Sequence, residues 1–127
     1  MKKSLLILAV TIAGMVACKK ETDMGGPAVT ILSPSSGEML TSGDSVLIEI
    51  TAEDEDMHEM EWKVVEAADT SHIYFQDGVH SHDVDVHYSQ KFLLPSVLAH
   101  TNVILYVHAE DHNDNSTDKS VSFSIMP

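Results

Sequence analysis

Apolar and polar residues alternate with a period of two along most of the chain after residue 28. The segments 46–53, 59–64 and 102–109 each carry an apolar side chain at every second position, which is the spacing of a strand with one buried face. This part of the chain does not sustain the 3.6-residue period of an amphipathic helix. Turn-forming stretches such as SPSSGE, TSGD, EAADTS, FQDG and EDHNDNSTD separate the runs. The predicted strands are Val29–Leu32, Asp44–Glu53, His58–Glu66, Ser71–Phe75, Val84–Leu93, Thr101–Glu110 and Lys119–Met126.

Seven short strands separated by turns predict an all-β fold, an immunoglobulin-like or fibronectin III-like β-sandwich. The third strand carries Trp62, which lies on the same alternating face as Met60 and Val64. We therefore expect Trp62 to be a core tryptophan. The alternative is an exposed tryptophan that stacks on a sugar.

The first 17 residues, MKKSLLILAVTIAGMVA, have the pattern of a secretory signal, with two lysines, an apolar run and small residues before Cys18. The apolar run is too short to span a bilayer, which takes about 20 residues. The segment MVAC is similar to the lipobox of bacterial lipoproteins, in which the cysteine after the cleavage site receives a lipid. The resemblance implies that residues 1–17 are a lipoprotein signal peptide and that Cys18 is lipidated. The alternative is an incidental cysteine in a plain secretory signal.

The predicted organisation has two further parts. Residues 18–28 are expected to form the lipidated cysteine and a flexible tether, and residues 29–127 a single sandwich domain. Cys18 is the only cysteine, so the chain has no intrachain disulfide. Lys19 stands where some lipoproteins carry the aspartate that retains them in the inner membrane. We therefore expect an outer-membrane lipoprotein of the cell envelope.

The chain is strongly acidic, with 20 Asp and Glu residues and a formal charge of −13. Removal of the predicted signal takes away Lys2 and Lys3 and leaves every acidic residue in place. Such a surface repels phosphate backbones, so we expect no nucleic-acid partner. The sequence has no nucleophile motif, phosphate loop or HExxH, so we predict that the protein is not an enzyme.

Histidine is frequent for so acidic a domain. The chain has eight, and the segment GVHSHDVDVHY alone carries His80, His82 and His87. The overlapping stretch SHIYFQDGVHSHD resembles the histidine-rich segment of an uncharacterised family of Bacteroidetes lipoproteins with an immunoglobulin-like domain. That family has no established activity, so the resemblance implies the fold and a role for the histidines, and nothing more. The matching positions are His72, Phe75, Asp77, His80 and His82.

The expected topology brings several histidines to one end of the sandwich. The loop between the second and third strands, the segment 76–83 and the end of the sixth strand should meet there. We therefore expect His58, His80, His82, His108 and His112 at this pole. Imidazole nitrogens are ligands that Zn²⁺ and Cu²⁺ prefer, so the sequence predicts a site for zinc or copper. The predicted ligands are His80, His82 and His108, completed by His112 or His72.

Three alternatives stay open. Acidic residues 53–56 and Asp111, Asp114 and Asp118 at the same pole offer oxygen ligands suited to Ca²⁺, although solvated carboxylates explain them as well. The histidines could be incidental in a non-catalytic adhesion or assembly module that binds a protein or glycan, with residues 73–75 as an exposed edge patch. Clustered imidazoles could also sense pH, because protonation near pH 6 makes them repel one another.

Overall fold

The structure is a computed structural model that describes residues 25–127, so the predicted signal peptide and Cys18 lie outside the described residues. The described part contains no helix that is long and apolar enough to cross a membrane. Its strands are β1 (Ala28–Ser33), β2 (Met39–Thr41), β3 (Ser45–Glu53), β4 (Met57–Glu66), β5 (Ile73–His80), β6 (Asp85–Leu93), β7 (Thr101–Asp111) and β8 (Ser116–Met126).

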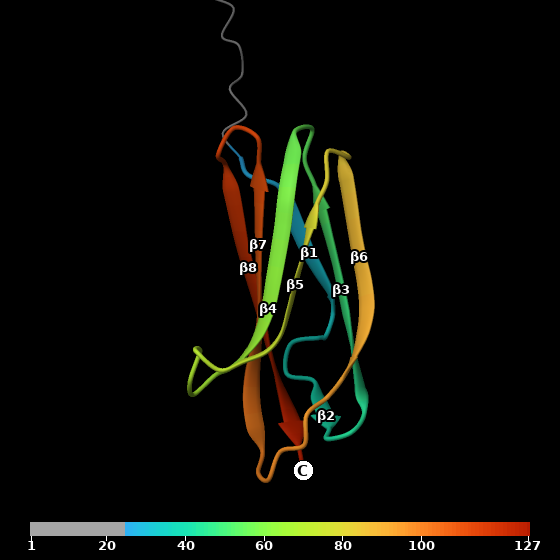
Figure 1. The fold of residues 1–127 in the computed structure, drawn as a ribbon, viewed down its shortest axis with the longest axis vertical. Coiled ribbons are helices and arrows are strands. Elements are labelled where there is room, and N and C mark those ends of the chain that lie inside the picture. Colours follow the sequence, from blue (N-terminus) through green and yellow to red (C-terminus); the bar gives the residue numbers. More distant parts are fainter. Residues whose placement is uncertain (1–24) are drawn as a thin grey trace, which may run out of the picture.

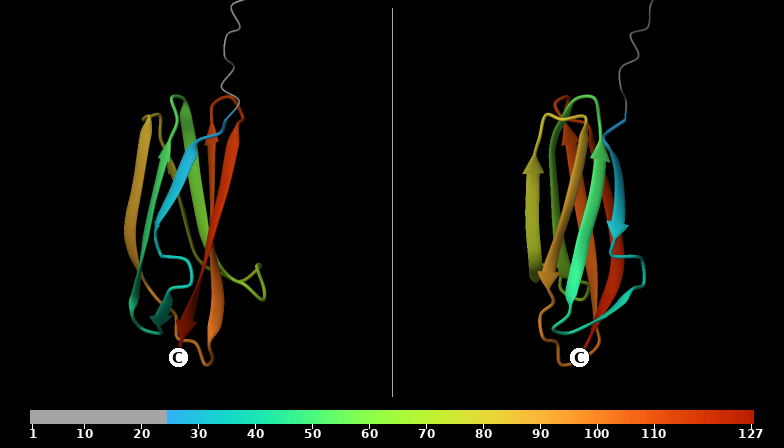
Figure 2. Two further views of the ribbon diagram at one scale, coloured as in Figure 1. Left: turned by 180° about the vertical axis from the view of Figure 1, so that it is seen from behind. Right: turned by 90° about the vertical axis from the view of Figure 1, so that its right-hand side faces the viewer.

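The strands form two sheets that pack face to face (Figures 1 and 2). One sheet has three strands in the order β1-β3-β6, and the other has five in the order β2-β8-β7-β4-β5. Neighbouring strands pair antiparallel, except for β2 and β8, which are parallel. This arrangement confirms the predicted immunoglobulin-like or fibronectin III-like β-sandwich.

Two elements differ from the prediction. Strand β2 was not expected, because three residues are too few to show a period; it forms by pairing with the end of β8. The stretch FQDG, predicted to be a turn, lies inside β5, where Phe75 pairs with Val64 and Gly78 pairs with Glu61. The ladder with β4 overrides the local turn preference of Asp-Gly, and β5 therefore runs on to His80.

The core contains the residues that the alternation assigns to it. Trp62 is only 2% exposed, which confirms it as the core tryptophan and excludes the sugar-stacking alternative. Buried side chains from both sheets surround it, so one core holds the whole sandwich together. The predicted inward positions that are buried include Val46, Ile48, Ile50, Ala52, Met60, Val64, Val103, Leu105, Val107, Ala109, Phe123 and Ile125.

Aromatic contacts link β4 to β6, and one hydrogen bond links β5 to β6, across the two sheets. The Trp62 ring lies 5.4 Å from Tyr88 and 5.2 Å from Phe92 between centroids. The Tyr88 hydroxyl donates a hydrogen bond to the Asp77 carboxylate at 2.8 Å. Burial, followed by this bond, raises the pKa of Tyr88 to about 12. These contacts hold β5, and the histidines at its end, against the second sheet.

Candidate metal centre

Three loops meet at one end of the sandwich, the upper end in Figure 1. They join β3 to β4, β5 to β6, and β7 to β8. Backbone hydrogen bonds tie them together, because the N–H of Ser81 donates to the His58 carbonyl at 3.1 Å and the N–H of His112 donates to the Asp56 carbonyl at 2.9 Å. We call this end the histidine pole. Its histidine cluster consists of His58, His80, His82 and His112.

A β-bulge in β4 aims two neighbouring side chains of the pole in one direction. The register of β4 against β7 shifts between Met57 and Glu59, so His58 is an extra residue in the ladder. Met57 and Met60 are both buried although they stand three residues apart, which strict alternation does not allow. The bulge therefore leaves His58 and Glu59 together on the outer side, as bulges beside functional sites often do.

The four rings of the histidine cluster contact one another. Nδ1 of His58 lies 2.9 Å from Nδ1 of His112, and Nε2 of His112 lies 2.9 Å from Nδ1 of His82. The His80 ring packs edge-on against His58, with 4.6 Å between the centroids. A neutral imidazole has one donor and one acceptor nitrogen, so His112 can accept a hydrogen bond from one neighbour and donate to the other.

Potential ligand atoms converge around His58, the half-buried member of the cluster. Within residues 25–127, one group of three side chains has ligand atoms that all lie within 4.8 Å of one another: His58, Glu59 and His80. His112 lies outside this group, although its Nδ1 contacts Nδ1 of His58 at 2.9 Å. Two nitrogens bound to one zinc ion at about 2.0–2.1 Å and at the tetrahedral angle are about 3.3 Å apart. The three side chains of the group would have to close toward this spacing to share an ion, and His112 would have to join them.

A buried carboxylate braces the β7–β8 loop that carries His112. Asp111 is 1% exposed. Its carboxylate accepts hydrogen bonds from the backbone N–H groups of Asn113 and Asn115, at 2.8 and 2.9 Å, and from the Asn115 side-chain amide at 2.8 Å. Burial by itself would raise the pKa of Asp111, but these hydrogen bonds outweigh it and lower the pKa. An ionised Asp111 therefore fixes the loop on which His112 stands.

His108 is not brought together with the cluster, contrary to the expectation that it binds metal beside His80 and His82. Its Nδ1 lies 2.7 Å from Asp118 and its Nε2 lies 3.6 Å from Glu110. The hydrogen bond with Asp118, supported by Glu110 against desolvation, raises the pKa of His108. Strand β7 does end at the pole, but the position of His108 along β7 turns its ring to the outer face of the sheet.

His72 is also separate from the cluster, so the structure does not support it as the completing ligand. It precedes β5, whereas the cluster lies where β5 ends, and its Nδ1 lies 2.9 Å from the Glu66 carboxylate. His87, on the three-stranded sheet, has its Nε2 2.9 Å from the Glu49 carboxylate. We call His72, His87 and His108 the paired histidines, because each ring contacts a carboxylate.

Acidic side chains of the β3–β4 loop stabilise that loop and link it to the β7–β8 loop. Asp54 accepts a hydrogen bond from the N–H of Asp56 at 2.8 Å, and Asp56 accepts one from the Asn113 side chain at 3.0 Å. Glu59 is the one carboxylate in the converging ligand group of the described residues. The nitrogen-rich composition of that group favours zinc or copper over the all-oxygen site that Ca²⁺ requires.

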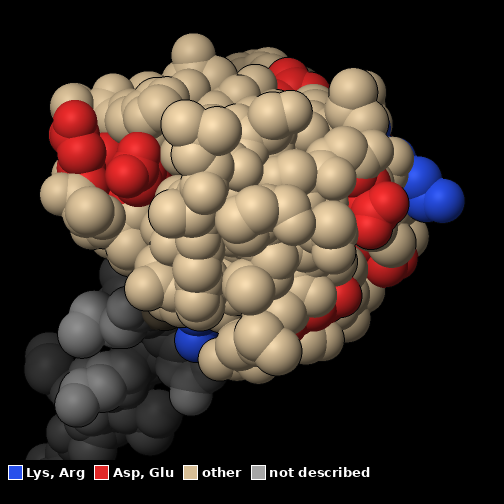
Figure 3. All heavy atoms as spheres, turned by 90° about the horizontal axis from the view of Figure 1, so that it is seen from below, with Lys and Arg blue, Asp and Glu red and all other residues tan. Residues whose placement is uncertain are grey.

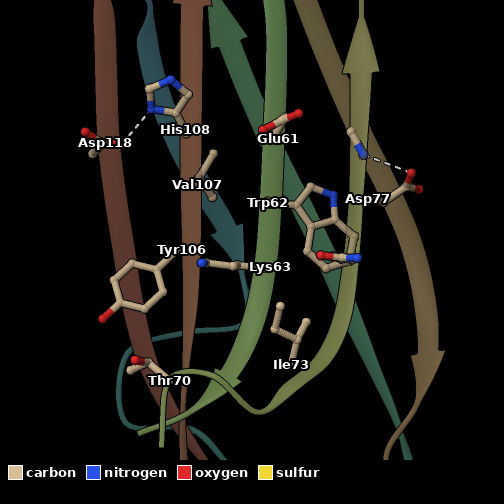
Figure 4. A pocket seen from close by; sticks show the side chains of 12 residues that line it. Glu61, Trp62, Lys63, Thr70, Ile73, Asp77, Tyr106, Val107, His108 and Asp118 are labelled. Carbon is tan, nitrogen blue, oxygen red and sulfur yellow. Dashed lines mark hydrogen bonds and ion pairs between the residues drawn. The ribbon is translucent and has the colours of Figure 1, made fainter.

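A hollow lies on the outer face of the five-stranded sheet, away from the histidine cluster (Figure 4). It has a volume of about 1020 Å³, and its lining includes Lys63 of β4 with Tyr106 and His108 of β7. Tyr106 is 38% exposed there. The edge patch expected at residues 73–75 is partial, since Ile73 is exposed but the two aromatic residues after it are half-buried against the core.

Comparisons with known proteins identify the fold. No protein-family model matches the chain, and no curated protein matches it. It is similar to an engineered protein, with a TM-score of 0.55 and 13% identity over 80% of this chain, which spans 20% of that protein's length. It is also similar to the fibronectin(III)-like modules of Clostridium thermocellum CbhA, with a TM-score of 0.50 and 18% identity over 77% of this chain and 94% of that one. At these identities the likeness shows the fold alone.

Sequence reasoning did not include Glu59 among the candidate ligands and left His58 outside the ligand set. Regular alternation puts two successive residues on opposite faces, so His58 and Glu59 could not both point at one ion. The signal that could have revealed the bulge is the three-residue spacing of Met57 and Met60, where a regular strand needs two.

Proposed function

We propose that this protein is a cell-envelope lipoprotein that binds a divalent transition-metal ion, zinc or copper, at the histidine cluster. One observation carries the proposal. The paired histidines each contact a carboxylate, whereas the four rings of the cluster contact one another. Imidazole nitrogens that face other imidazole nitrogens are arranged as ligands around a shared ion would be.

His58, His80 and His112 are the proposed ligands, with Glu59 as the fourth. His58 is central because its ring contacts both His80 and His112. Glu59 belongs to the same converging group, in which the bulge aligns it with His58. Three imidazoles and one carboxylate make a four-coordinate site of the kind that zinc accepts.

His82 acts on the metal through His112 in this assignment. When His112 binds the ion through Nδ1, its Nε2–H is free to donate to Nδ1 of His82, which lies 2.9 Å away. Ligand histidines commonly donate their second N–H to a neighbour, and this fixes the ring and its tautomer. His82 therefore orients a ligand, in place of the direct coordination expected from the sequence.

The proposed activity is to hold and exchange a metal ion. His80, His82 and His112 are exposed, so an ion can enter and leave from solvent. A metal with four protein ligands keeps no open position for a substrate, which argues against catalysis at this site. Anchoring through Cys18, suggested by the MVAC segment, would hold this site at the outer membrane.

A non-catalytic adhesion or assembly module is the second candidate, because the immunoglobulin-like fold fits such a role. The hollow that contains Tyr106 and Lys63 is the surface that a protein or glycan partner would use. In that case the histidine cluster is incidental, and metal affinity would be weak.

Calorimetric titration of residues 19–127, without a histidine tag, tests the metal site. We expect one Zn²⁺ or Cu²⁺ ion per chain with submicromolar affinity. His58→Ala should weaken binding by at least about 100-fold because it removes the central ligand. His87→Ala is the matched control: it removes an imidazole that contacts a carboxylate, and it should leave the affinity unchanged. Weak binding of several ions that both variants retain would contradict the proposal.

A further inference from the structure

The first residues that the structure describes lie at the histidine pole. Gly26 lies against the start of β8, where a Cβ atom would stand 2.5 Å from the Ser116 carbonyl oxygen and 2.7 Å from the Thr117 hydroxyl. That approach is too close for any side chain, so the backbone at Gly26 is held against β8. Pro27, the next residue, is buried. The point at which the domain continues toward Cys18 is therefore fixed beside the β7–β8 loop (Figure 1).

The sequence between this point and Cys18 is short compared with the domain. Gly25 lies seven positions after Cys18, so the two lie at most about 25 Å apart even if the chain is fully extended. Strand β8 has 11 residues and runs from the histidine pole to the far end, so about 33 Å separates the two ends of the sandwich. An anchor at Cys18 cannot reach a membrane that lies against the far end.

We infer that the histidine pole faces the lipid bilayer and that the metal site works in the water layer next to the membrane. The inference rests on the proposed lipid anchor at Cys18. The partner is the bilayer that holds the anchor, because the fixed position of Gly26 and the length of the linking segment leave that end of the domain nearest to it. The metal site then exchanges ions with the water layer at the membrane surface.

The far end of the sandwich has a surface that would itself favour contact with lipid. That end carries few charges in the middle of its surface, with acidic groups at the margins (Figure 3). Leu98 in the β6–β7 loop is fully exposed, and Leu93 at the end of β6 is 68% exposed. Apolar side chains such as these would favour contact with lipid if the domain were free to turn. The anchor prevents this, and the far end is left facing away from the bilayer.

Energy transfer on liposomes tests the orientation. The full chain is produced in cells that lipidate it, and it carries one added cysteine, Asp83→Cys at the histidine pole or Leu98→Cys at the far end. Each thiol is labelled with a fluorescent donor, and the protein is placed in phosphatidylethanolamine and phosphatidylglycerol vesicles with acceptor-labelled headgroups. Because about 33 Å separates the two ends, transfer should be at least about twofold more efficient for the donor at position 83.

Several results would overturn the orientation. Equal transfer from the two donors, or more from position 98, would show that the pole does not face the bilayer. Transfer from the position 83 donor that persists in Cys18→Ser would show that the anchor does not set the orientation. A mature chain whose mass lacks a lipid would remove the basis of the inference. The zinc titration uses residues 19–127, so the metal site can fail or succeed independently of these results.

Discussion

The histidine cluster and the paired histidines place the same side chain in two different environments. His72, His87 and His108 each contact a carboxylate, an arrangement that uses the ring to satisfy a neighbouring acid on a sheet or loop surface. In the cluster, three loops and one bulge bring imidazole against imidazole. This difference shows that the number of histidines does not by itself define a metal site. Ligand atoms from several side chains must also converge, as those of His58, Glu59 and His80 do.

The largest expected effect comes from removing the brace of the pole. Asp111→Ala leaves three hydrogen-bond donors of the β7–β8 loop without their buried acceptor and should lower the free energy of unfolding by about 2–4 kcal/mol. Asp83→Ala removes the same charge from an exposed position of the pole and should change it by less than about 0.5 kcal/mol. Urea unfolding of both variants measures the difference. Equal stability would show that the loop does not depend on Asp111.

The Asp111 effect should also depend on pH. Because the pKa of Asp111 is lowered in the folded protein, its contribution is fully present above the ordinary value of 3.8 and is lost as the pH falls through the lowered pKa. The stability difference between wild type and Asp111→Ala should therefore be constant from pH 5 to 7 and shrink only in strong acid. A difference that already disappears at pH 5 would contradict an ionised brace.

Metal binding should stabilise the fold through the cluster alone. At a free zinc concentration one hundred times the dissociation constant, binding adds about 2.7 kcal/mol, which raises Tm by about 10–20 °C for a domain of this size. Replacing all three paired histidines by alanine should leave this shift intact, whereas His58→Ala with His80→Ala should abolish it. Thermal unfolding followed by circular dichroism decides between them. Loss of the zinc-induced rise in Tm in the paired-histidine variant would show that the metal binds outside the histidine cluster.

His82→Ala should have an intermediate effect on metal affinity. It removes the group that accepts the second N–H of His112 and leaves the proposed ligands in place, so zinc binding should weaken by about tenfold. Affinity in the wild type should also fall between pH 7.5 and pH 5.5, because protons compete with the metal for the imidazole nitrogens. Calorimetry at both pH values provides the measurement. If His82→Ala weakens zinc binding as much as His58→Ala does, His82 is a direct ligand.

The smallest expected effect concerns the pair of His108 and Asp118. The raised pKa of His108 means that the pair stabilises the fold fully below pH 6.5 and that this contribution disappears as the pH rises through the raised pKa. The pair is partly exposed, so a double-mutant cycle of His108→Ala and Asp118→Ala should give a coupling of only about 0.2–1 kcal/mol at pH 6. The coupling should approach zero at pH 9. The same cycle should leave zinc affinity unchanged.

Local patterns were sufficient for the fold and insufficient for the site. Trp62 and the alternating core positions are buried as predicted, because the period of two depends only on neighbouring residues. His108 was placed at the pole from the end of its strand, but the facing of a side chain depends on its position within the strand, and Asp118 arrives from β8 to pair with it. Glu59 was missed because the bulge at His58 changes which face it occupies.

The sequence alone was sufficient to predict an acidic all-β sandwich, most of its strands and its alternating core positions, together with the resemblance to a lipoprotein signal that ends at Cys18. These properties follow from composition and short-range periodicity. The sequence also predicted that the four histidines of the cluster lie at one pole together with His108, but the contacts between their rings, and the separation of His108, follow from the tertiary structure. His58, His80, His82 and His112 come from three separated segments, and their approach depends on strand register, one bulge and a loop braced by Asp111. Those are long-range relations, and a one-residue shift in any of them would turn the rings apart.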